Sequence, residues 1–221
     1  MSFFNLSKLA SKTKLRRISC EHSHHDGVPL FLNPTLATSS LLKGKLRPLV
    51  ELPKYVDPNE WLAANIVDFF EYINLFYGTI SYFCTPSTCS SMSAGPHNEY
   101  TWSDTGLRGA KLPAPQYIDY AMTWMQNCID DEAVFPTKAG KEFPRDFVQT
   151  ARAIARQMFR VFAHIFYAHY DKLVHLAAER HFNSLFAHFI AFCREFELLD
   201  KKDMAPLHDL IQLLDARGVF G

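Results

Sequence analysis

Cys84-Thr85-Pro86-Ser87-Thr88-Cys89 is the stretch that decides how this chain folds, together with His164 and His169, which follow 80 positions later. Four residues separate the two cysteines, and four separate the two histidines. Two thiols in a turn and two imidazoles form the ligand set of a closed zinc site, which holds a loop in place and does not by itself catalyse. The same residues also suit a fold without metal, in which the cysteines are small apolar residues and the histidines line a helix.

The spacing of His164 and His169 sets a geometric condition on such a site. Positions five apart on a regular helix lie about 140° apart around its axis. We therefore expect a helix end or a distortion between the two histidines if both bind one ion.

Length, hydropathy and cysteine count favour a single domain inside the cell. The 221 residues are 48% hydrophobic and include 19 Phe, enough to bury one sizeable core. The sequence has no apolar run of eighteen residues and no secretory signal at its start, so we expect a soluble protein without membrane insertion. Five cysteines, an odd number, argue against a disulfide framework and for reduced thiols.

Charge is divided unevenly along the chain. Residues 1–47 hold eight Lys and Arg against Glu21 and Asp26, a net +6, and because the whole chain is neutral the remainder carries −6. A basic arm suits nucleic acid, anionic lipid or plain solvation. The acidic body disfavours nucleic-acid binding and fits a basic protein partner better.

Residues 1–45 lack any sustained hydrophobic period, and we interpret them as a basic, flexible N-terminal arm in front of a helical domain, residues 46–221. Two motifs fall in this arm. Cys20 with His22, His24 and His25 would make a second metal cluster, but no companion pair of ligands accompanies them. Ser19 ends a short pattern, Arg-Arg-Ile-Ser, that resembles a kinase substrate site and is equally compatible with a solvated basic run.

The helical domain is predicted to be mainly α. Asp57 is a suitable N-cap, with Pro58 at the first helical position, Glu60 three residues after the cap, and Gly78 placed to end the helix. Residues 79–114 carry turn residues throughout and need a device to hold them, and the zinc site would be that device.

Hydrophobic spacing and turn residues predict the remaining elements. We expect a short strand or ribbon near Tyr100 and Trp102. The expected helices are residues 115–129, a long helix from Pro144 through Ile165, residues 172–196 with a break near Phe182 and Asn183, and residues 203–217 capped by Asp203.

A series of ordered motifs extends this interpretation. They are Asn59-Glu60-Trp61, Asp68-Phe69-Phe70, Leu75-Phe76-Tyr77-Gly78-Thr79-Ile80, the cysteine turn, Met92-Ser93-Ala94-Gly95-Pro96, Tyr100-x-Trp102, Pro113-Ala114-Pro115-Gln116-Tyr117-Ile118-Asp119-Tyr120, Phe135-Pro136-Thr137-Lys138, Phe143-Pro144, Arg160-Val161-Phe162-Ala163-His164-Ile165, Glu195-Phe196 and Ala205-Pro206-Leu207. Over about residues 46–216 the chain resembles the Mob (Mob/phocein) family of kinase co-activators. The resemblance implies a helical bundle around a four-helix core, with a short β-ribbon and a structural Zn²⁺ bound by Cys84, Cys89, His164 and His169.

The same resemblance implies a non-catalytic co-activator that binds the N-terminal regulatory region of an NDR/LATS-type Ser/Thr kinase and supports its activation. Carried over residue by residue, the kinase surface includes Glu60, Trp61, Asp68 and His188. Trp61 is equally compatible with a core position, and Glu60 with completing the helix cap. The implied locations are the cytoplasm, the nucleus, and the cell cortex or growth sites.

Two branches of the family fit the sequence. The opening residues, Leu52-Pro53-Lys54-Tyr55-Val56-Asp57 and Gly95-Pro96-His97 are most similar to the fungal branch that acts in cell polarity and morphogenesis. The alternative, a mitotic-exit and Hippo-type branch, also binds phosphopeptides through a basic cluster. Arg156 and Arg160 match that cluster, but Gln157 replaces its central cation, so we expect only weak phosphate binding.

Catalytic motifs are absent from the sequence. It has no Gly-rich phosphate loop, no Gly-x-Ser-x-Gly turn and no His-Glu-x-x-His helix. A zinc hydrolase, which needs an open coordination position and a nearby base, is therefore the remote alternative.

Overall fold

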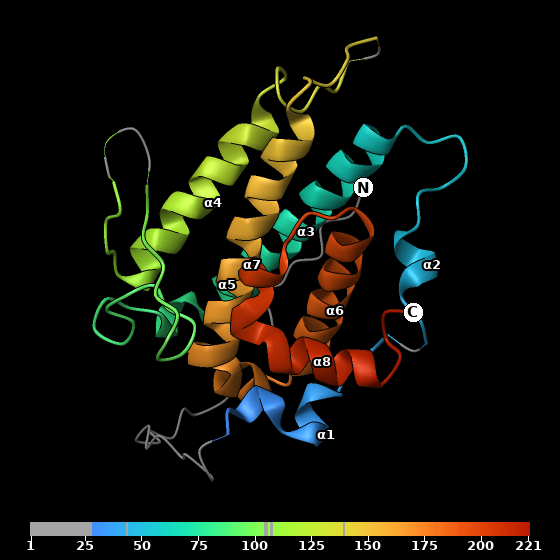
Figure 1. The fold of residues 1–221 in the computed structure, drawn as a ribbon. Helices are drawn as coiled ribbons and strands as arrows, with labels where there is room; N and C mark the ends of the chain where they lie inside the picture. The colour runs from blue at the N-terminus through green and yellow to red at the C-terminus, as the bar shows by residue number, and fades with distance from the viewer. Residues whose placement is uncertain (1–27, 43, 104–105, 107, 139) are drawn as a thin grey trace, which may run out of the picture.

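The computed structural model describes residues 28–42, 44–103, 106, 108–138 and 140–221, and over these residues the protein is mainly α-helical (Figure 1). The long helices are α3 (Pro58–Ile80), α4 (Ala114–Asp130), α5 (Phe147–His175) and α6 (Glu179–Glu195). The short elements are η2 (Leu30–Leu32), α1 (Pro34–Ala37), α2 (Arg47–Val50), η3 (Ser81–Phe83), α7 (Lys201–Met204), η4 (Ala205–Leu207) and α8 (His208–Ala216). None of the helices in the described part of the chain is long and apolar enough to cross a membrane.

Helix α5 is the centre of the core and packs most extensively against α3, with further contacts to α4 and α6. Its phenylalanines recur every three or four residues, so they form one stripe that faces a similar stripe on α6. The rings of Phe162 and Phe189 lie 5.1 Å apart, and those of Phe166 and Phe186 lie 4.9 Å apart. Aromatic pairs of this kind add about 0.5–1.5 kcal/mol each beyond their buried area.

The start of α3 is as predicted, whereas its end is not. Asp57 Oδ1 accepts hydrogen bonds from the backbone N–H groups of Asn59, at 2.8 Å, and Glu60, at 3.1 Å. The helix continues past Gly78 to Ile80, which is fully buried. Burial of Ile80 stabilises the extra residues more than the glycine disfavours them, so Gly78 stays inside the helix.

The break expected near Phe182 and Asn183 lies instead between α5 and α6, where Ala177 adopts a left-handed φ of 53°. Helix α5 also begins at Phe147, three residues after Pro144, and runs on to His175. Asn183 does not break α6, because its side-chain amide donates to the carbonyl oxygens of Leu36, at 2.8 Å, and Ser39, at 2.9 Å. Asn183 therefore lies within α6 and connects this helix to residues 36–39.

The C-terminal region is also divided differently from the prediction of one helix over residues 203–217. Asp200, not Asp203, is the cap, and its Oδ1 accepts from the Asp203 N–H at 2.8 Å. Pro206 lies in the 3-10 turn η4 that separates α7 from α8. The turn forms there because proline has no N–H to continue the α-helical hydrogen bonds.

Residues 28–42, which we expected to belong to the arm, pack against the helical core. The ring of Phe31 is 2% exposed and lies 4.9 Å from that of Tyr167 and 5.4 Å from that of Phe166. The division at residue 45 stays a prediction. The motifs at Cys20, His22, His24 and His25, and at Ser19, lie outside the described residues.

The expected ribbon near Tyr100 is reduced, in the described part of residues 79–114, to two isolated antiparallel bridges. They join Ser93 to Glu99 and Trp102 to Ala110. The Trp102 ring packs edge-on at 5.3 Å from Tyr117 of α4, so this region is fastened to the bundle largely by side chains.

Candidate metal centre and partner-binding surface

Cys84, Cys89, His164 and His169 come together in one buried cluster. Their ligand atoms all lie within 4.8 Å of one another. Cys84 Sγ is 3.5 Å from His164 Nε2, and Cys89 Sγ is 3.5 Å from His169 Nε2. Metal–sulfur and metal–nitrogen bonds of about 2.3 and 2.0 Å at a tetrahedral angle give sulfur–nitrogen distances of about 3.5 Å. The cluster therefore has the dimensions of a four-coordinate metal site.

The turn between the two cysteines is closed by its own hydrogen bonds. The Cys89 N–H donates to the Thr85 carbonyl at 2.8 Å, and the Thr88 hydroxyl donates to the Phe83 carbonyl at 2.8 Å. The Ala114 N–H donates to the Cys89 carbonyl at 3.0 Å, which ties the second cysteine to the start of α4. Both thiols are thus positioned by backbone that does not depend on the histidines.

Both histidines lie on α5, which is uninterrupted between them, so the expected helix end or distortion is absent and that prediction was wrong. The two rings nevertheless have centroids only 5.2 Å apart. The imidazole side chains are long enough to lean toward each other around the helix, whereas the 140° condition considered only the backbone.

The orientation of His164 suits a metal ligand. Its Nδ1–H donates to the Ser93 carbonyl at 2.8 Å. This bond fixes the tautomer in which Nε2 keeps a free lone pair, and Nε2 is the atom that faces Cys84. Ser93 belongs to the irregular segment between η3 and α4, so its hydrogen bond with His164 also connects that segment to α5.

The electrostatics of the thiol pair favour one thiolate. The hydrogen bond between Cys84 and Cys89 lowers the pKa of Cys89 well below its usual value and raises the pKa of Cys84. Hydrogen bonds from His164 and His169 also lower the pKa of Cys89. The thiolate is the form of cysteine that binds metals. All four side chains of the cluster are at most 9% exposed, so the cluster is closed to solvent.

Tyr77 of α3, which the sequence presents only as part of the Leu75–Ile80 motif, also belongs to this centre. Its hydroxyl hydrogen-bonds to Cys84, and burial raises the pKa of Tyr77, which keeps it a neutral donor. The sequence gives one indication of this contact. Tyr77 lies only seven residues before Cys84, near the end of the helix that precedes the cysteine turn.

Two other cysteines provide a test of the ligand assignment. Cys193 is buried in α6 and Cys128 is half-buried on α4, and neither belongs to the cluster. We expect Cys128→Ala and Cys193→Ala to leave the metal content per chain unchanged, as measured by atomic emission on purified protein. A loss of metal in either variant would contradict the assignment.

The four predicted kinase-binding residues differ in exposure. Glu60 and Asp68 are exposed on α3, whereas Trp61 is half-buried and its Nε1–H donates to the Val50 carbonyl at 3.2 Å. The imidazole of His188 on α6 lies edge-on at 5.0 Å from Phe69. Burial lowers the pKa of His188, and the nearby Asp68 carboxylate partly opposes this shift. The structure therefore brings Asp68 and His188 together and uses Trp61 largely for packing.

Beside this face of α3 lies a groove of about 420 Å³, bordered by the end of α4 and the loop that follows it. Most of its walls are apolar, and Asp130 and Glu132 contribute carboxylates. The lining residues are Ala63, Ala64, Val67, Ile129, Asp130, Glu132, Phe135, Pro136, Thr137 and Phe143. Sequence reasoning did not find this groove, because its walls come from three separate segments.

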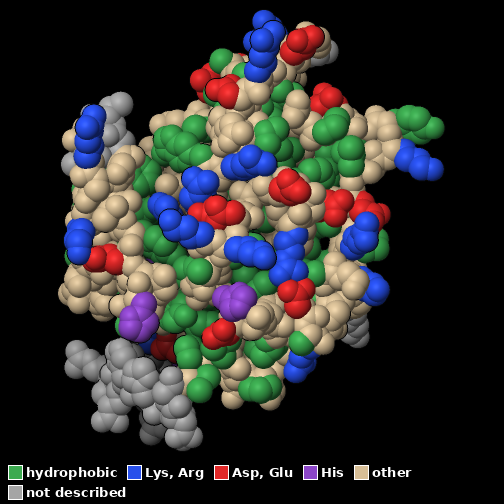
Figure 2. Space-filling view, viewed as in Figure 1, with side chains coloured by type: hydrophobic (Ala, Val, Ile, Leu, Met, Phe, Trp, Pro, Cys, Tyr) green, Lys and Arg blue, Asp and Glu red, His purple; other side chains and the backbone are tan. Residues whose placement is uncertain are grey.

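Arg156 and Arg160, the expected phosphate ligands, are both engaged within the protein. Arg156 Nε lies 3.1 Å from Asp203 Oδ1. Arg160 Nη1 donates to the Tyr117 hydroxyl at 2.6 Å, and that hydroxyl donates to Gln157 Oε1 at 2.8 Å. Figure 2 shows Lys and Arg side chains gathered on the face formed by α5, α6 and α7, with Asp and Glu side chains among them. A phosphate group would have to compete with these contacts.

The fold is a helical bundle, and its four cysteine and histidine ligands form one buried cluster with the dimensions of a metal site. The chain belongs to the Mob1/phocein family, whose sequence pattern matches residues 38–207. It is 49% identical over 189 residues to the maintenance of ploidy protein mob2 of Schizosaccharomyces pombe, a match that covers 86% of this chain and 78% of that protein.

Two further relatives are named CBK1 kinase activator protein MOB2. The protein from Saccharomyces cerevisiae is 47% identical over 86% of this chain and 66% of its own length, and the protein from Candida albicans is 47% identical over 86% and 61%. This chain therefore spans slightly less than two thirds of each of them. The MOB kinase activator-like 1 homolog B of Dictyostelium discoideum is 48% identical over 80% of this chain and 83% of its own, so identity alone does not separate the branches.

Proposed function

We propose that this protein is a non-catalytic co-activator that binds the N-terminal regulatory region of an NDR-type Ser/Thr kinase and supports its activation in cell polarity and morphogenesis. The observation that carries the proposal is the outward face of α3, where Glu60 and Asp68 stand beside the apolar groove. The names of the two CBK1 kinase activators among its relatives support it. Its places of action are then those of the kinase, in the cytoplasm, the nucleus and at growth sites.

The surface has the chemistry to hold a basic, amphipathic helix. An apolar face of such a helix fits the groove wall formed by Ala63 and Val67, while its Lys and Arg side chains meet the carboxylates of Glu60 and Asp68. Because burial lowers the pKa of His188, that ring is neutral at pH 7 and does not repel a basic partner. The −6 charge of residues 48–221 adds long-range attraction.

For the cluster of Cys84, Cys89, His164 and His169 we propose a structural Zn²⁺. The donor set of two thiols and two imidazoles is one that zinc prefers, and it needs no further ligand. The role of the metal would be to fasten the irregular segment to α5. This closed geometry also disfavours the zinc hydrolase, since a catalytic ion keeps one position open for water or substrate.

The direct test measures binding of the N-terminal regulatory segment of an NDR-type kinase to the purified protein by fluorescence anisotropy. Both the equilibrium titration and the association kinetics are recorded at several salt concentrations. We expect saturable binding whose association rate falls as salt rises, and increased activity of the full kinase in the presence of the protein. A folded, zinc-containing preparation that neither binds the segment nor activates the kinase would contradict the proposal.

Phosphopeptide binding is the second candidate function, and the contacts of Arg156 indicate that it is weak. We expect Asp203→Asn, which removes the carboxylate beside Arg156 and keeps the side-chain shape, to strengthen binding of a phosphothreonine peptide about fivefold, or about 1 kcal/mol. Anisotropy with the peptide and its unphosphorylated twin measures this preference. The matched control is the double variant Arg156→Ala, Arg160→Ala, in which the preference should disappear.

The opposite outcome is equally specific. Submicromolar binding of the phosphopeptide by the unaltered protein, lost in the double variant, would contradict this expectation and shift the assignment toward the Hippo-type branch.

A further inference from the structure

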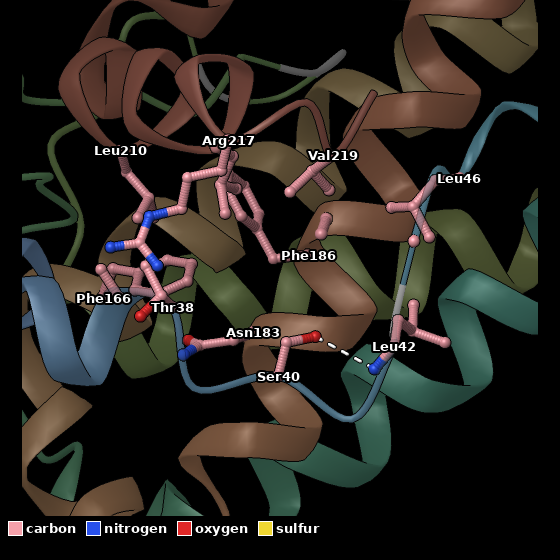
Figure 3. Close-up of a pocket in the computed structure, with 14 residues that line it drawn as sticks. Thr38, Ser40, Leu42, Leu46, Phe166, Asn183, Phe186, Leu210, Arg217 and Val219 are labelled. Atoms are coloured by element: carbon pink, nitrogen blue, oxygen red, sulfur yellow. Dashed lines mark hydrogen bonds between the residues drawn. The ribbon is translucent and has the colours of Figure 1, made fainter. Parts of the chain in front are cut away.

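A cavity of about 100 Å³ lies where residues 37–42 and 44–46 pass α6 and α8 (Figure 3). We call it the α6–α8 cavity. It lies apart from the metal cluster and from the groove beside α3, with which it shares no lining residue. Its lining residues are Ala37, Thr38, Ser40, Leu42, Gly44, Leu46, Phe166, Asn183, Phe186, Ala187, Leu210, Leu214, Arg217 and Val219.

Hydrogen bonds hold the walls of this cavity in place. The Leu46 N–H donates to the Val219 carbonyl at 2.9 Å, which joins the segment after α8 to the start of α2. On the other side, the Leu41 N–H donates to the Ser184 hydroxyl at 2.8 Å. The Asn183 amide is already used by the Leu36 and Ser39 carbonyls. These hydrogen bonds fix the backbone around the cavity, so the cavity keeps its shape.

The interior of the cavity is apolar. Phe166, Phe186, Leu210 and Leu214 are each at most 7% exposed, and they contribute carbon atoms to its surface. A water molecule needs two to four polar partners to be held in a cavity, and such a lining offers few. An unfilled apolar cavity also lowers stability in proportion to its volume. Both arguments favour an apolar occupant.

Arg217 supplies a cation at the edge of the cavity. In Figure 3 its guanidinium group extends toward Thr38 and Phe166. Arg217 forms no ion pair within the described residues. The carboxylate closest in sequence, Asp215, is held by both Nη atoms of Arg194, at 2.7 and 2.6 Å. Arg217 is thus available to an anionic group from outside.

We propose that the α6–α8 cavity binds a small apolar molecule with a carboxylate head, of the short-chain fatty acid class. The hydrocarbon chain would lie between α6 and α8, and the carboxylate would pair with the planar guanidinium of Arg217. An apolar cavity of about 150 Å³ holds benzene, so this smaller one limits the enclosed part of the chain to about four or five carbon atoms. The proposal is independent of kinase binding.

The test compares hexanoate with hexanol, which has the same chain and no charge. Each is titrated into the full-length protein while the methyl NMR signals of Leu210, Leu214 and Val219 are followed. We expect saturable shifts with both and tighter binding of hexanoate. Arg217→Gln should weaken hexanoate binding about tenfold and leave hexanol binding unchanged, because only the carboxylate uses the cation.

Arg180→Gln is the matched control, since Arg180 is an exposed arginine on α6 that bonds to Ser39 at 3.1 Å and does not line the cavity. It should leave both affinities unchanged. Ala187→Leu, which places a larger side chain in the cavity, should abolish both, with unchanged metal content as the check on folding. Should that variant fail to fold, the Arg217→Gln comparison decides.

Three results would overturn the proposal. They are the absence of saturable methyl shifts, equal weakening of hexanoate and hexanol by Arg217→Gln, and nuclear Overhauser contacts between the cavity methyl groups and protons of residues 1–27. The last result would assign the cavity to the protein's own N-terminal segment.

Discussion

Replacing Cys84 with alanine should remove the metal and lower the stability of the fold by about 4 kcal/mol, the range reached when a protein loses a structural metal. For a chain of 221 residues this corresponds to a fall in melting temperature of about 10 °C. The measurements are zinc per chain by atomic emission and thermal unfolding by circular dichroism.

The effect should be large because the irregular segment has few other restraints. Between η3 and α4 the described residues form only isolated bridges and turns. The cluster joins Cys84 and Cys89 to α5, and the hydrogen bond from His164 to the Ser93 carbonyl joins a further residue of the segment to the same helix. Without the ion, a buried thiol and two buried imidazoles would remain without a common partner, which costs stability.

Cys193→Ala is the matched control, since it is the same substitution at a cysteine that is 1% exposed. It removes a buried sulfur from α6 and should cost about 1 kcal/mol of packing without loss of metal. The zinc proposal fails if purified parent protein contains no zinc, or if Cys84→Ala unfolds at the same temperature as the parent.

The sequence predicted those features that depend on neighbouring residues. The start of α3 is determined within four positions, by the cap at Asp57, the proline that follows it and the hydrogen bond to Glu60. The residues of the metal cluster were also predictable, because paired thiols and paired imidazoles at short spacings are typical of metal sites and the ordered motifs around them supported the same set.

Features that depend on distant residues were predicted less well. The end of α3 follows the burial of Ile80, and the boundary between α5 and α6 follows the left-handed turn at Ala177. Asn183 was mistaken for a breaker because its partners, the Leu36 and Ser39 carbonyls, lie more than 140 residues away. The residues next to Arg156 in the sequence likewise do not indicate its ion pair with Asp203, which lies 47 positions later.

Asp68→Lys should abolish binding of the kinase regulatory segment, with a loss of affinity of at least about 100-fold, or about 3 kcal/mol. Asp68 is exposed on α3 beside His188, and it has no capping role. Deleting one carboxylate from a partly desolvated pair costs about 2–5 kcal/mol, and less at an exposed rim. The lysine goes further, because it places a positive charge against a basic partner.

The control is Asp209→Lys, the same charge reversal at an exposed position on α8, which should bind the segment as the parent does. Zinc content and helical circular dichroism should be intact in both variants, so that a loss of binding is attributed to the surface and not to folding. If Asp68→Lys, Glu60→Lys and His188→Ala all retain the affinity of the parent, the partner does not bind the α3 face, and neither that face nor the apolar groove beside it serves the co-activator function.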